Sequence, residues 1–262
     1  MKRILPLLLV LISIPALLSA REVVRLTRYG GQEITGISAA HMFQVELVKT
    51  DQTRAVIEID SDLEQYLRFT LKPDGIVEVD LNIPKGEQRR IERILDWNKR
   101  TLKLTVYLPE FRFIKLGDMA RLTVNDQFNG DQVEIKAEDM AKITRLDLDA
   151  ESITVRADDM ASLNLTLWCG TLNAKANDMA KVTLRGQARE AYAESNDMAN
   201  IKAEDFKAEE ATLKAADMAK ASMYVSRYLY ARSSDMAAVS YTGNPPQIDL
   251  KTPKRTIYRV NQ

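Results

Sequence analysis

Apolar and polar residues alternate in short runs along most of the chain. Within residues 161–180, every second position is apolar from 163 to 167, and after a break the alternation resumes from 172 to 176. This spacing of two residues is typical of β-strands with one buried face, whereas an amphipathic helix would repeat its apolar positions every three or four residues. The stretch therefore predicts two short strands joined by a loose corner, and neighbouring stretches repeat the pattern.

A tripeptide, Asp-Met-Ala, closes each of these units. It occurs seven times, at successive steps of 21, 20, 19, 19, 20 and 18 residues. A fixed period of this length is typical of a solenoid, in which each repeat is one turn of a coil. Two strands in about 20 residues leave no room for a crossover helix, so each strand should pair with its equivalent one turn later. The prediction is an all-β, single-domain parallel β-helix (solenoid) with about 20 residues per coil, right-handed by the general crossover rule.

The seven aspartates are predicted to form a ladder along one edge of the coil, with equivalent residues about 4.8 Å apart. Two carboxylates at that distance repel by roughly 1 kcal/mol in water. We expect backbone N–H groups to offset this repulsion by donating hydrogen bonds to the carboxylates, as in an Asx-turn, which is a structural role. The aspartates are Asp118, Asp139, Asp159, Asp178, Asp197, Asp217 and Asp235.

A row of cations such as Ca²⁺ is the alternative role for this ladder. Calcium takes six to eight oxygen ligands, usually from several carboxylates. Of the seven residues that precede the aspartates, only Glu138 and Asp158 would add a carboxylate, and the glycine-rich nonapeptide of calcium-binding β-rolls is missing. The pattern therefore favours the structural role and predicts no metal site and no cofactor.

The seven methionines of the tripeptide form a second predicted ladder. Methionine fills irregular gaps well, so we expect these side chains to be buried at the corner. If they were exposed instead, the stacked thioethers would make an apolar stripe suited to contact with a partner. The methionines are Met119, Met140, Met160, Met179, Met198, Met218 and Met236.

The start of the chain predicts export. Residues 1–20 have the pattern of a signal peptide, with Lys2 and Arg3 before an apolar run and a small-residue cleavage site at Ser19-Ala20. The mature protein is expected in the periplasm, at the cell surface or in the medium, with no membrane span after cleavage.

Residues 21–262 are expected to form one β-helix domain. Residues 21–116 lack the tripeptide and predict irregular first coils plus a cap over the strand edges, with an inserted helix near 86–98. Residues 117–242 hold the seven Asp-Met-Ala coils, and 243–262 predict a C-terminal cap. Five tyrosines near this end are expected to close the bottom of the core, although aromatic rings can also stack on sugars. They are Tyr224, Tyr228, Tyr230, Tyr241 and Tyr258.

The composition argues against several functions. The chain has 37 basic and 37 acidic residues, so it stays close to neutral after the signal is removed and no nucleic-acid partner is expected. Cys169 is the single cysteine, which leaves no internal disulfide. The single histidine, His41, lies at a predicted strand start with no evident partner, and the carboxylates follow the period instead of gathering around a base. The sequence therefore predicts no catalytic residue.

Short blocks outside the repeat are similar to those of a known family. They are residues 37–47 (ISAAHMFQVEL), 104–109 (LTVYLP) leading into 114–118 (IKLGD), and 241–245 (YTGNP). With them, the chain from about residue 36 onward resembles the putative auto-transporter adhesin, head GIN domain family of exported bacterial proteins. The corners of that family are usually rich in Gly and Ser, where this chain has Asp-Met-Ala. The resemblance implies a right-handed β-helix and a role in adhesion or surface structure, and it brings no catalytic residues.

These observations favour a non-catalytic exported protein that adheres to or binds a surface through a face of the β-helix, with a glycan or a cell-surface protein as its partner. Two alternatives stay open. A polysaccharide lyase or hydrolase on a β-helix would need clustered carboxylates and a base. A purely structural envelope component, which could assemble end to end, would need no ligand, and the sequence does not predict an oligomeric state.

Overall fold

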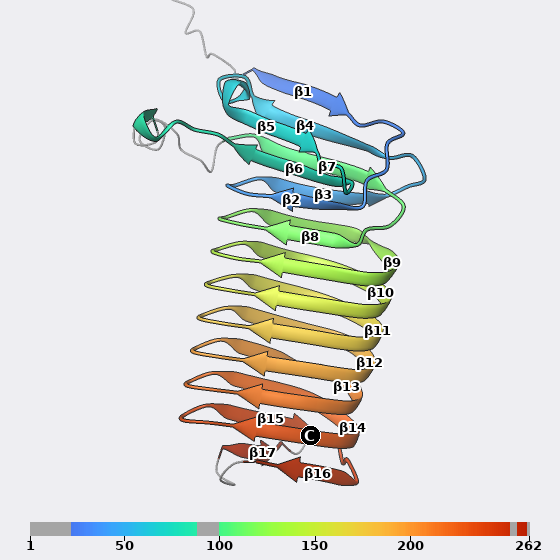
Figure 1. The fold of residues 1–262 in the computed structure, drawn as a ribbon, viewed down its shortest axis with the longest axis vertical. Coiled ribbons are helices and arrows are strands. Elements are labelled where there is room, and N and C mark those ends of the chain that lie inside the picture. Colours follow the sequence, from blue (N-terminus) through green and yellow to red (C-terminus); the bar gives the residue numbers. More distant parts are fainter. Residues whose placement is uncertain (1–21, 88–99, 252–255, 261–262) are drawn as a thin grey trace, which may run out of the picture.

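The protein is a stack of flattened parallel coils (Figure 1). The computed structural model describes residues 22–87, 100–251 and 256–260. Its strands form one continuous 17-stranded sheet that winds around a single apolar core. The predicted all-β parallel β-helix with about 20 residues per coil is confirmed.

The regular part of the stack contains one long strand per coil. The two short strands predicted for each period are one continuous strand that bends at the loose corner, because the hydrogen-bonded ladder continues through the bend. Each of these strands pairs in parallel with the next. They are β9 (Arg121–Ala137), β10 (Lys142–Ala157), β11 (Ser162–Ala176), β12 (Lys181–Ser195), β13 (Asn200–Ala215) and β14 (Lys220–Ser233).

The loose corner absorbs the differences in coil length. The register shifts between Ile143 and Asp147 in β10, between Thr183 and Arg185 in β12, and between Ala203 and Lys207 across β13 and β14. At each shift one strand carries extra residues opposite its neighbour, one at the first two shifts and three at the last, as in a β-bulge. Each shift lies at the loose corner or in the strand segment just before it. The Asp-Met-Ala corners, which lie at the other end of each coil, therefore stay aligned from coil to coil.

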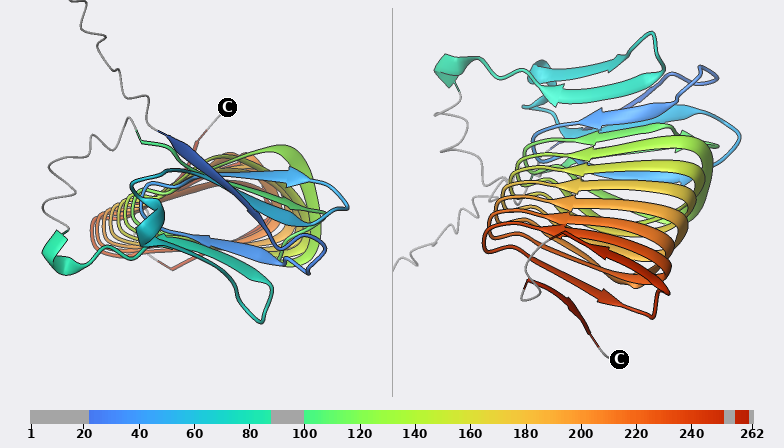
Figure 2. Two further views of the ribbon diagram at one scale, coloured as in Figure 1. Left: turned by 90° about the horizontal axis from the view of Figure 1, so that it is seen from above. Right: turned by 60° about the horizontal axis from the view of Figure 1, so that its bottom comes forward.

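The core consists of the inward-facing residues of successive coils. The left view of Figure 2 looks down the stack of these coils. Alanines such as Ala157 and Ala176 face inward beside the Asp-Met-Ala corner, whereas Phe128 and Phe206 are fully buried at the loose corner. Because an alanine side chain takes little room, the interior is narrow at the Asp-Met-Ala corner, as the many inward alanines in the sequence suggest.

The coils near the N-terminus are not stacked in sequence order. The coil formed by β2 (Gly36–Ala39) and β3 (Gln44–Lys49) lies between two later coils. On one side it pairs with β6 (Ile76–Leu81) and β7 (Leu102–Leu108), and on the other with β8 (Phe113–Leu116) and β9. After β3 the chain therefore forms the N-terminal end of the stack. It then continues on the opposite side of its own first coil as β8 and β9.

Antiparallel strands cover the N-terminal end of the stack. β4 (Arg54–Asp60) pairs with β7 and with β1 (Val23–Arg28), and β5 (Leu67–Leu71) pairs with β6 after the short 3-10 helix η1 (Glu64–Tyr66). These strands end the parallel ladder and protect its edge from pairing with another chain.

At the C-terminal end, β15 (Ala238–Thr242) and β16 (Gln247–Leu250) pair with β14, and β17 (Ile257–Arg259) pairs with β15. The predicted signal peptide lies outside the described residues. Most of the helix expected near 86–98 also lies outside them. The structure describes only its start, where residues 85–87 are helical. Within the described ranges, no helix is both long and apolar enough to cross a membrane.

Candidate functional site

Each Asp-Met-Ala corner is a four-residue turn with one left-handed residue. In the turn 177–180, the N–H of Ala180 donates to the carbonyl of Asn177 at 3.1 Å. The φ angles of the seven corner aspartates lie between 51° and 63°, and none of the corner methionines has a positive φ. A positive φ at the second residue of a turn is a conformation that glycine normally supplies. Aspartate recurs at this position because it is among the few other residues that tolerate the left-handed conformation.

The aspartate side chains also link one coil to the next. The Oδ2 atom of Asp118 accepts the backbone N–H of His41 at 2.8 Å, that of Asp139 accepts the N–H of Asp118 at 3.2 Å, and that of Asp159 accepts the N–H of Asp139 at 3.3 Å. The expected backbone donors are therefore present at these three corners. They belong to the preceding coil, however, and not to the same turn. The local pattern could not show this, because the donor is 20 or 21 residues away in the chain at two of these corners and 77 residues away at the third.

Substitutions at Asp159 should separate these two roles. Asp159→Ala keeps a β-carbon in the left-handed conformation and loses the hydrogen bond from Asp139, so we expect it to lower the free energy of unfolding by about 1–2 kcal/mol. Asp159→Gly loses the same hydrogen bond but relieves the backbone strain, so its loss should be smaller. Urea denaturation of both variants measures the difference, and an alanine variant more stable than the glycine variant would contradict this account of the corner.

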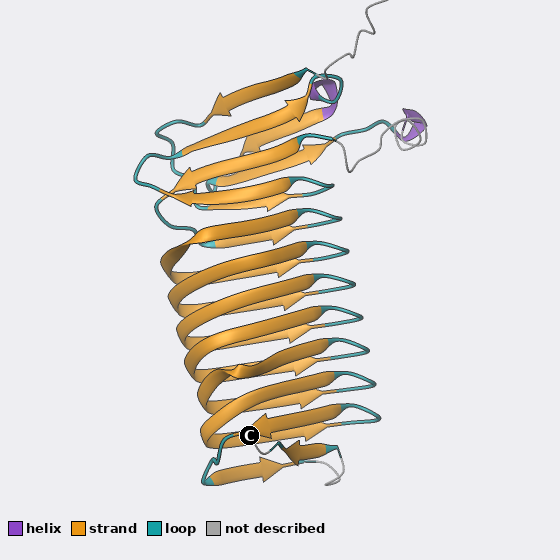
Figure 3. Cartoon of the chain, turned by 180° about the vertical axis from the view of Figure 1, so that it is seen from behind, coloured by secondary structure: helices purple, strands orange, loops and turns teal. Residues whose placement is uncertain are grey.

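The corner methionines are exposed, so the prediction that they are buried is wrong. Between 38% and 76% of each residue's surface is accessible, whereas the alanine that follows each methionine is fully buried. The narrow corner leaves room for an alanine side chain only, so the turn directs the longer side chain outward. The stacked corners run along one edge of the molecule (Figure 3). We call the exposed row the methionine ridge, and its members are Met119, Met140, Met160, Met179, Met198, Met218 and Met236.

His41 begins the same row of corners, which the sequence analysis missed. Its φ is 56°, and its carbonyl accepts the N–H of Met119 at 2.9 Å, as the carbonyls of the five corner aspartates from Asp118 to Asp197 do for the next coil. Its side chain lies against an acidic residue, with His41 Nδ1 2.6 Å from Asp80 Oδ1, but the two atoms are not aligned as a hydrogen bond. The signal in the sequence was Met42, which follows His41 as a methionine follows each corner aspartate.

The calcium alternative finds no ligand set in the described part of the chain. Within it, no three His, Cys, Asp or Glu side chains come close enough to share a metal ion. The carboxylates of Asp118, Asp139 and Asp159 instead accept backbone hydrogen bonds.

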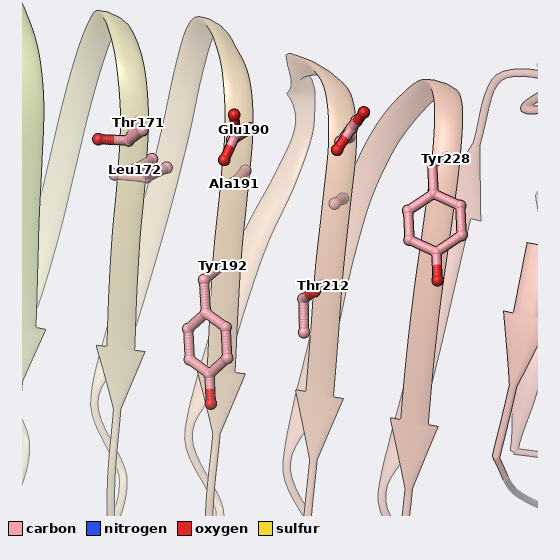
Figure 4. Close-up of a pocket in the computed structure, with 9 residues that line it drawn as sticks. Thr171, Leu172, Glu190, Ala191, Tyr192, Thr212 and Tyr228 are labelled. Atoms are coloured by element: carbon pink, nitrogen blue, oxygen red, sulfur yellow. The ribbon is translucent and has the colours of Figure 1, made fainter.

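A second candidate surface lies on the outer side of the strands that lead into the Asp-Met-Ala corner. A shallow depression of about 280 Å³ opens there across β11, β12, β13 and β14 (Figure 4). Two rows of outward-facing side chains line the depression. Each row runs across the coils, because residues at equivalent positions on neighbouring coils are directly paired. We call this surface the tyrosine face, and its outward-facing lining residues are Thr171, Glu190, Tyr192, Glu210, Thr212 and Tyr228.

The Tyr192 ring is held in place by charged neighbours. Its hydroxyl donates to Glu194 Oε2 at 2.8 Å, and the ammonium groups of Lys175 and Lys214 lie 5.6 Å and 5.0 Å from the ring centre. Burial alone would raise the pKa of Glu194, but the hydrogen bonds from Tyr192 and Lys175 and the nearby lysine charges hold it below its ordinary value. Glu194 is therefore ionised at neutral pH and keeps the Tyr192 hydroxyl as a donor.

Of the five tyrosines predicted to close the bottom of the core, one does so. Tyr241 is 9% exposed and packs in the core. Tyr228 pairs in register with Glu210, and Tyr230 with Thr212, so both face outward on the tyrosine face or beside it. Tyr258 is half exposed on β17, and Tyr224 is only partly buried. The sequence could not separate these cases, because β-bulges at the loose corner change which strand positions face outward.

Over most of the chain, comparison with known proteins identifies the family that the sequence blocks resemble. The model of the putative auto-transporter adhesin, head GIN domain family matches residues 33–245. No curated protein matches the chain.

Solved structures of similar fold are described as adhesins or as a lipid-binding protein. A putative adhesin from Parabacteroides distasonis has a TM-score of 0.77 at 15% identity, covering 92% of this chain and 98% of that one. A putative adhesin from Parabacteroides merdae has 0.74 at 14%, covering 92% and 97%. A putative lipid binding protein from Parabacteroides distasonis has 0.73 at 14%, covering 91% and 97%. At these identities the likeness shows the fold alone. The family model, in contrast, matches most of the chain, and the protein therefore belongs to the putative auto-transporter adhesin, head GIN domain family.

Proposed function

We propose that the protein is a non-catalytic exported adhesion protein that binds a glycan on its tyrosine face. The observation that carries the proposal is the depression in which Tyr192 and Tyr228 stand beside hydroxyl and carboxylate side chains on adjacent rigid strands. Support also comes from the family and from the similar solved structures, which are named as adhesins.

The chemistry of the tyrosine face suits a sugar. Tyrosine rings offer apolar surfaces at little cost in conformational entropy, and a sugar ring can pack against such a surface. Thr171 and Thr212 can donate and accept hydrogen bonds, while Glu190 and Glu210 accept them from sugar hydroxyls. Because all of these side chains project from paired strands, their spacing is set before the ligand arrives, which lowers the entropic cost of binding.

The same face is poorly suited to hydrolysis, although Glu190 and Glu210 are paired in register on adjacent strands. Each carboxylate forms an ion pair with an arginine, Glu190 with Arg189 and Glu210 with Arg227. Glycoside hydrolysis needs one carboxylic acid that gives up a proton, and both of these side chains are exposed, paired acceptors.

The cysteine is no better suited to catalysis. Burial, together with the negative charges of Asp149 and Glu151, raises the pKa of the Cys169 thiol to about 12. The thiol therefore stays protonated at neutral pH, whereas a thiolate would be the nucleophile. A non-catalytic role is thus the better supported alternative.

The double variant Tyr192→Ala, Tyr228→Ala tests the proposal. Wild-type protein is screened on a glycan array, and the affinity for the best glycan is then measured by titration calorimetry. Removing two aromatic contacts worth about 1–2 kcal/mol each should weaken binding on the order of 30-fold or more.

The matched control is Tyr258→Ala, because Tyr258 is also exposed but lies on β17, outside the tyrosine face. It should bind the glycan as the wild type does. Three results would count against the proposal. A wild-type protein that binds no glycan would favour a purely structural component, and equal binding by the double variant would move the site elsewhere. Cleavage of the bound glycan would instead support an enzyme.

A further inference from the structure

We propose that the methionine ridge is a binding site for soft monovalent metal ions, Cu(I) or Ag(I). The ridge is an exposed row of thioethers that the tyrosine face does not use. It lies at the Asp-Met-Ala corner, and the proposal does not depend on glycan binding.

The geometry brings neighbouring sulfurs within reach of one ion. The N–H of Met179 donates to the carbonyl of Asp159 at 2.8 Å, and the N–H of Met198 donates to that of Asp178 at 2.7 Å, so successive corners are in register. Equivalent residues are thus about 4.8 Å apart, the spacing of paired strands. Two metal–sulfur bonds, taken at the roughly 2.3 Å of a zinc–thiolate bond, span almost the same distance. Methionine has three rotatable side-chain bonds, so two or three neighbouring thioethers can turn toward one ion without moving the backbone.

The chemistry of the ridge selects the ion. A thioether is a soft, neutral ligand that suits Cu(I) and binds hard ions such as Ca²⁺ poorly. Each ridge methionine directly follows a corner aspartate, whose exposed carboxylate raises the local concentration of cations. The row of corners therefore presents a ligand for a soft ion together with charge of the opposite sign.

The same carboxylates argue against a lipid surface as the occupant. Burying the ridge in a bilayer would bring an aspartate from every coil close to the hydrocarbon, and removing a charged carboxylate from water is costly. Anionic headgroups would also be repelled. A metal ion avoids both costs because it binds outside the protein surface and attracts the carboxylates.

Leucine substitutions separate metal ligation from apolar contact, since leucine keeps an apolar side chain of similar size but has no sulfur. The test variant is Met140→Leu, Met179→Leu, Met218→Leu, which leaves no two neighbouring methionines in the ridge. The matched control is Met223→Leu, because Met223 is fully buried in the core. All proteins carry Cys169→Ser, so that the thiol cannot bind the ion itself.

Silver nitrate is titrated first, since Ag(I) is not oxidised under these conditions, and Cu(I) is then titrated anaerobically against a coloured Cu(I) chelator. We expect the parent and the Met223→Leu control to bind at least one ion, and the triple variant to lose at least one bound ion or to bind at least 10-fold more weakly. The methyl ¹H–¹³C signals of the ridge methionines should shift on binding.

Two results would overturn the proposal. One is a parent protein that does not compete with the chelator, and the other is a triple variant that binds as well as the parent. The second result would also be expected if the ridge served only as an apolar contact for a membrane or a protein. Equal urea midpoints for all variants would confirm that the comparison is made between folded proteins.

Discussion

Asp60→Ala is expected to lower the free energy of unfolding by about 3 kcal/mol. Asp60 is 2% exposed, and its Oδ2 atom accepts a hydrogen bond from Arg100 Nη1 at 3.0 Å, where the Arg100 side chain is itself 4% exposed. Removing one partner of a buried ion pair leaves an uncompensated buried charge, which typically costs about 3–5 kcal/mol. The low end of that range applies here, because Arg100 also contacts Asp62 at 2.9 Å and keeps that partner.

This ion pair holds the antiparallel end of the stack together. Asp60 ends β4, Arg100 precedes β7, and Asp60 Oδ1 also accepts the N–H of Thr101 at 3.4 Å. Urea denaturation followed by circular dichroism measures the effect. Asp62→Ala is the control, because the Asp62 side chain is 57% exposed and its removal leaves the buried Arg100 paired with Asp60, so the loss should be about 1 kcal/mol or less. Equal losses in the two variants would show that burial does not decide the strength of this pair.

Gly186→Ala is expected to have an effect at least as large, about 3 kcal/mol or more. The φ angle of Gly186 is +108°, a conformation that residues with a β-carbon rarely adopt. A β-carbon built there would lie 2.0 Å from the carbonyl oxygen of Leu167 on the preceding coil. Backbone atoms cannot rotate away as a side chain can, so the two coils would have to separate and break part of their ladder.

Gly117→Ala is the matched control for this prediction. The nearest atom to a β-carbon at Gly117 is Glu138 Oε1 at 3.5 Å, an ordinary contact, so the change should lie within about 0.5 kcal/mol. A Gly186→Ala protein as stable as this control would mean that the coil adapts at the loose corner. Because Gly186 lies in the same strand as Tyr192, the destabilised protein should also bind the proposed glycan more weakly.

The local pattern was sufficient to predict the coil itself. Alternation of apolar and polar residues, as in 163–167, determines which side of a strand can be buried, since successive side chains point to opposite faces. The period of the tripeptide then requires strands to pair with their equivalents, because so few residues per unit leave no other neighbour to pair with. Both are properties of consecutive residues, and the structure confirms them in β11, where Leu163, Leu165 and Leu167 are buried.

The orientation of the methionines depended on geometry that the pattern does not contain. Alternation stops at a turn, so counting positions from the strand could not place Met179 inside or outside. The positive φ of Asp178 directs the chain so that Met179 points to solvent and Ala180 to the core. The same left-handed requirement explains why aspartate, and once histidine, recurs at the corner, whereas the sequence analysis had assigned the aspartates only to side-chain hydrogen bonding.

The sequence by itself thus determined the strands, their period and the single parallel coil, because these follow from side-chain alternation and repetition along the chain. Only the tertiary structure decided that the β2–β3 coil lies between later coils, that His41 meets Asp80, and that Tyr192 and Tyr228 share a depression. Each of these depends on register between segments far apart in the chain. That register is set by how the coils stack and where β-bulges fall, and neither leaves a periodic signal in the residues themselves.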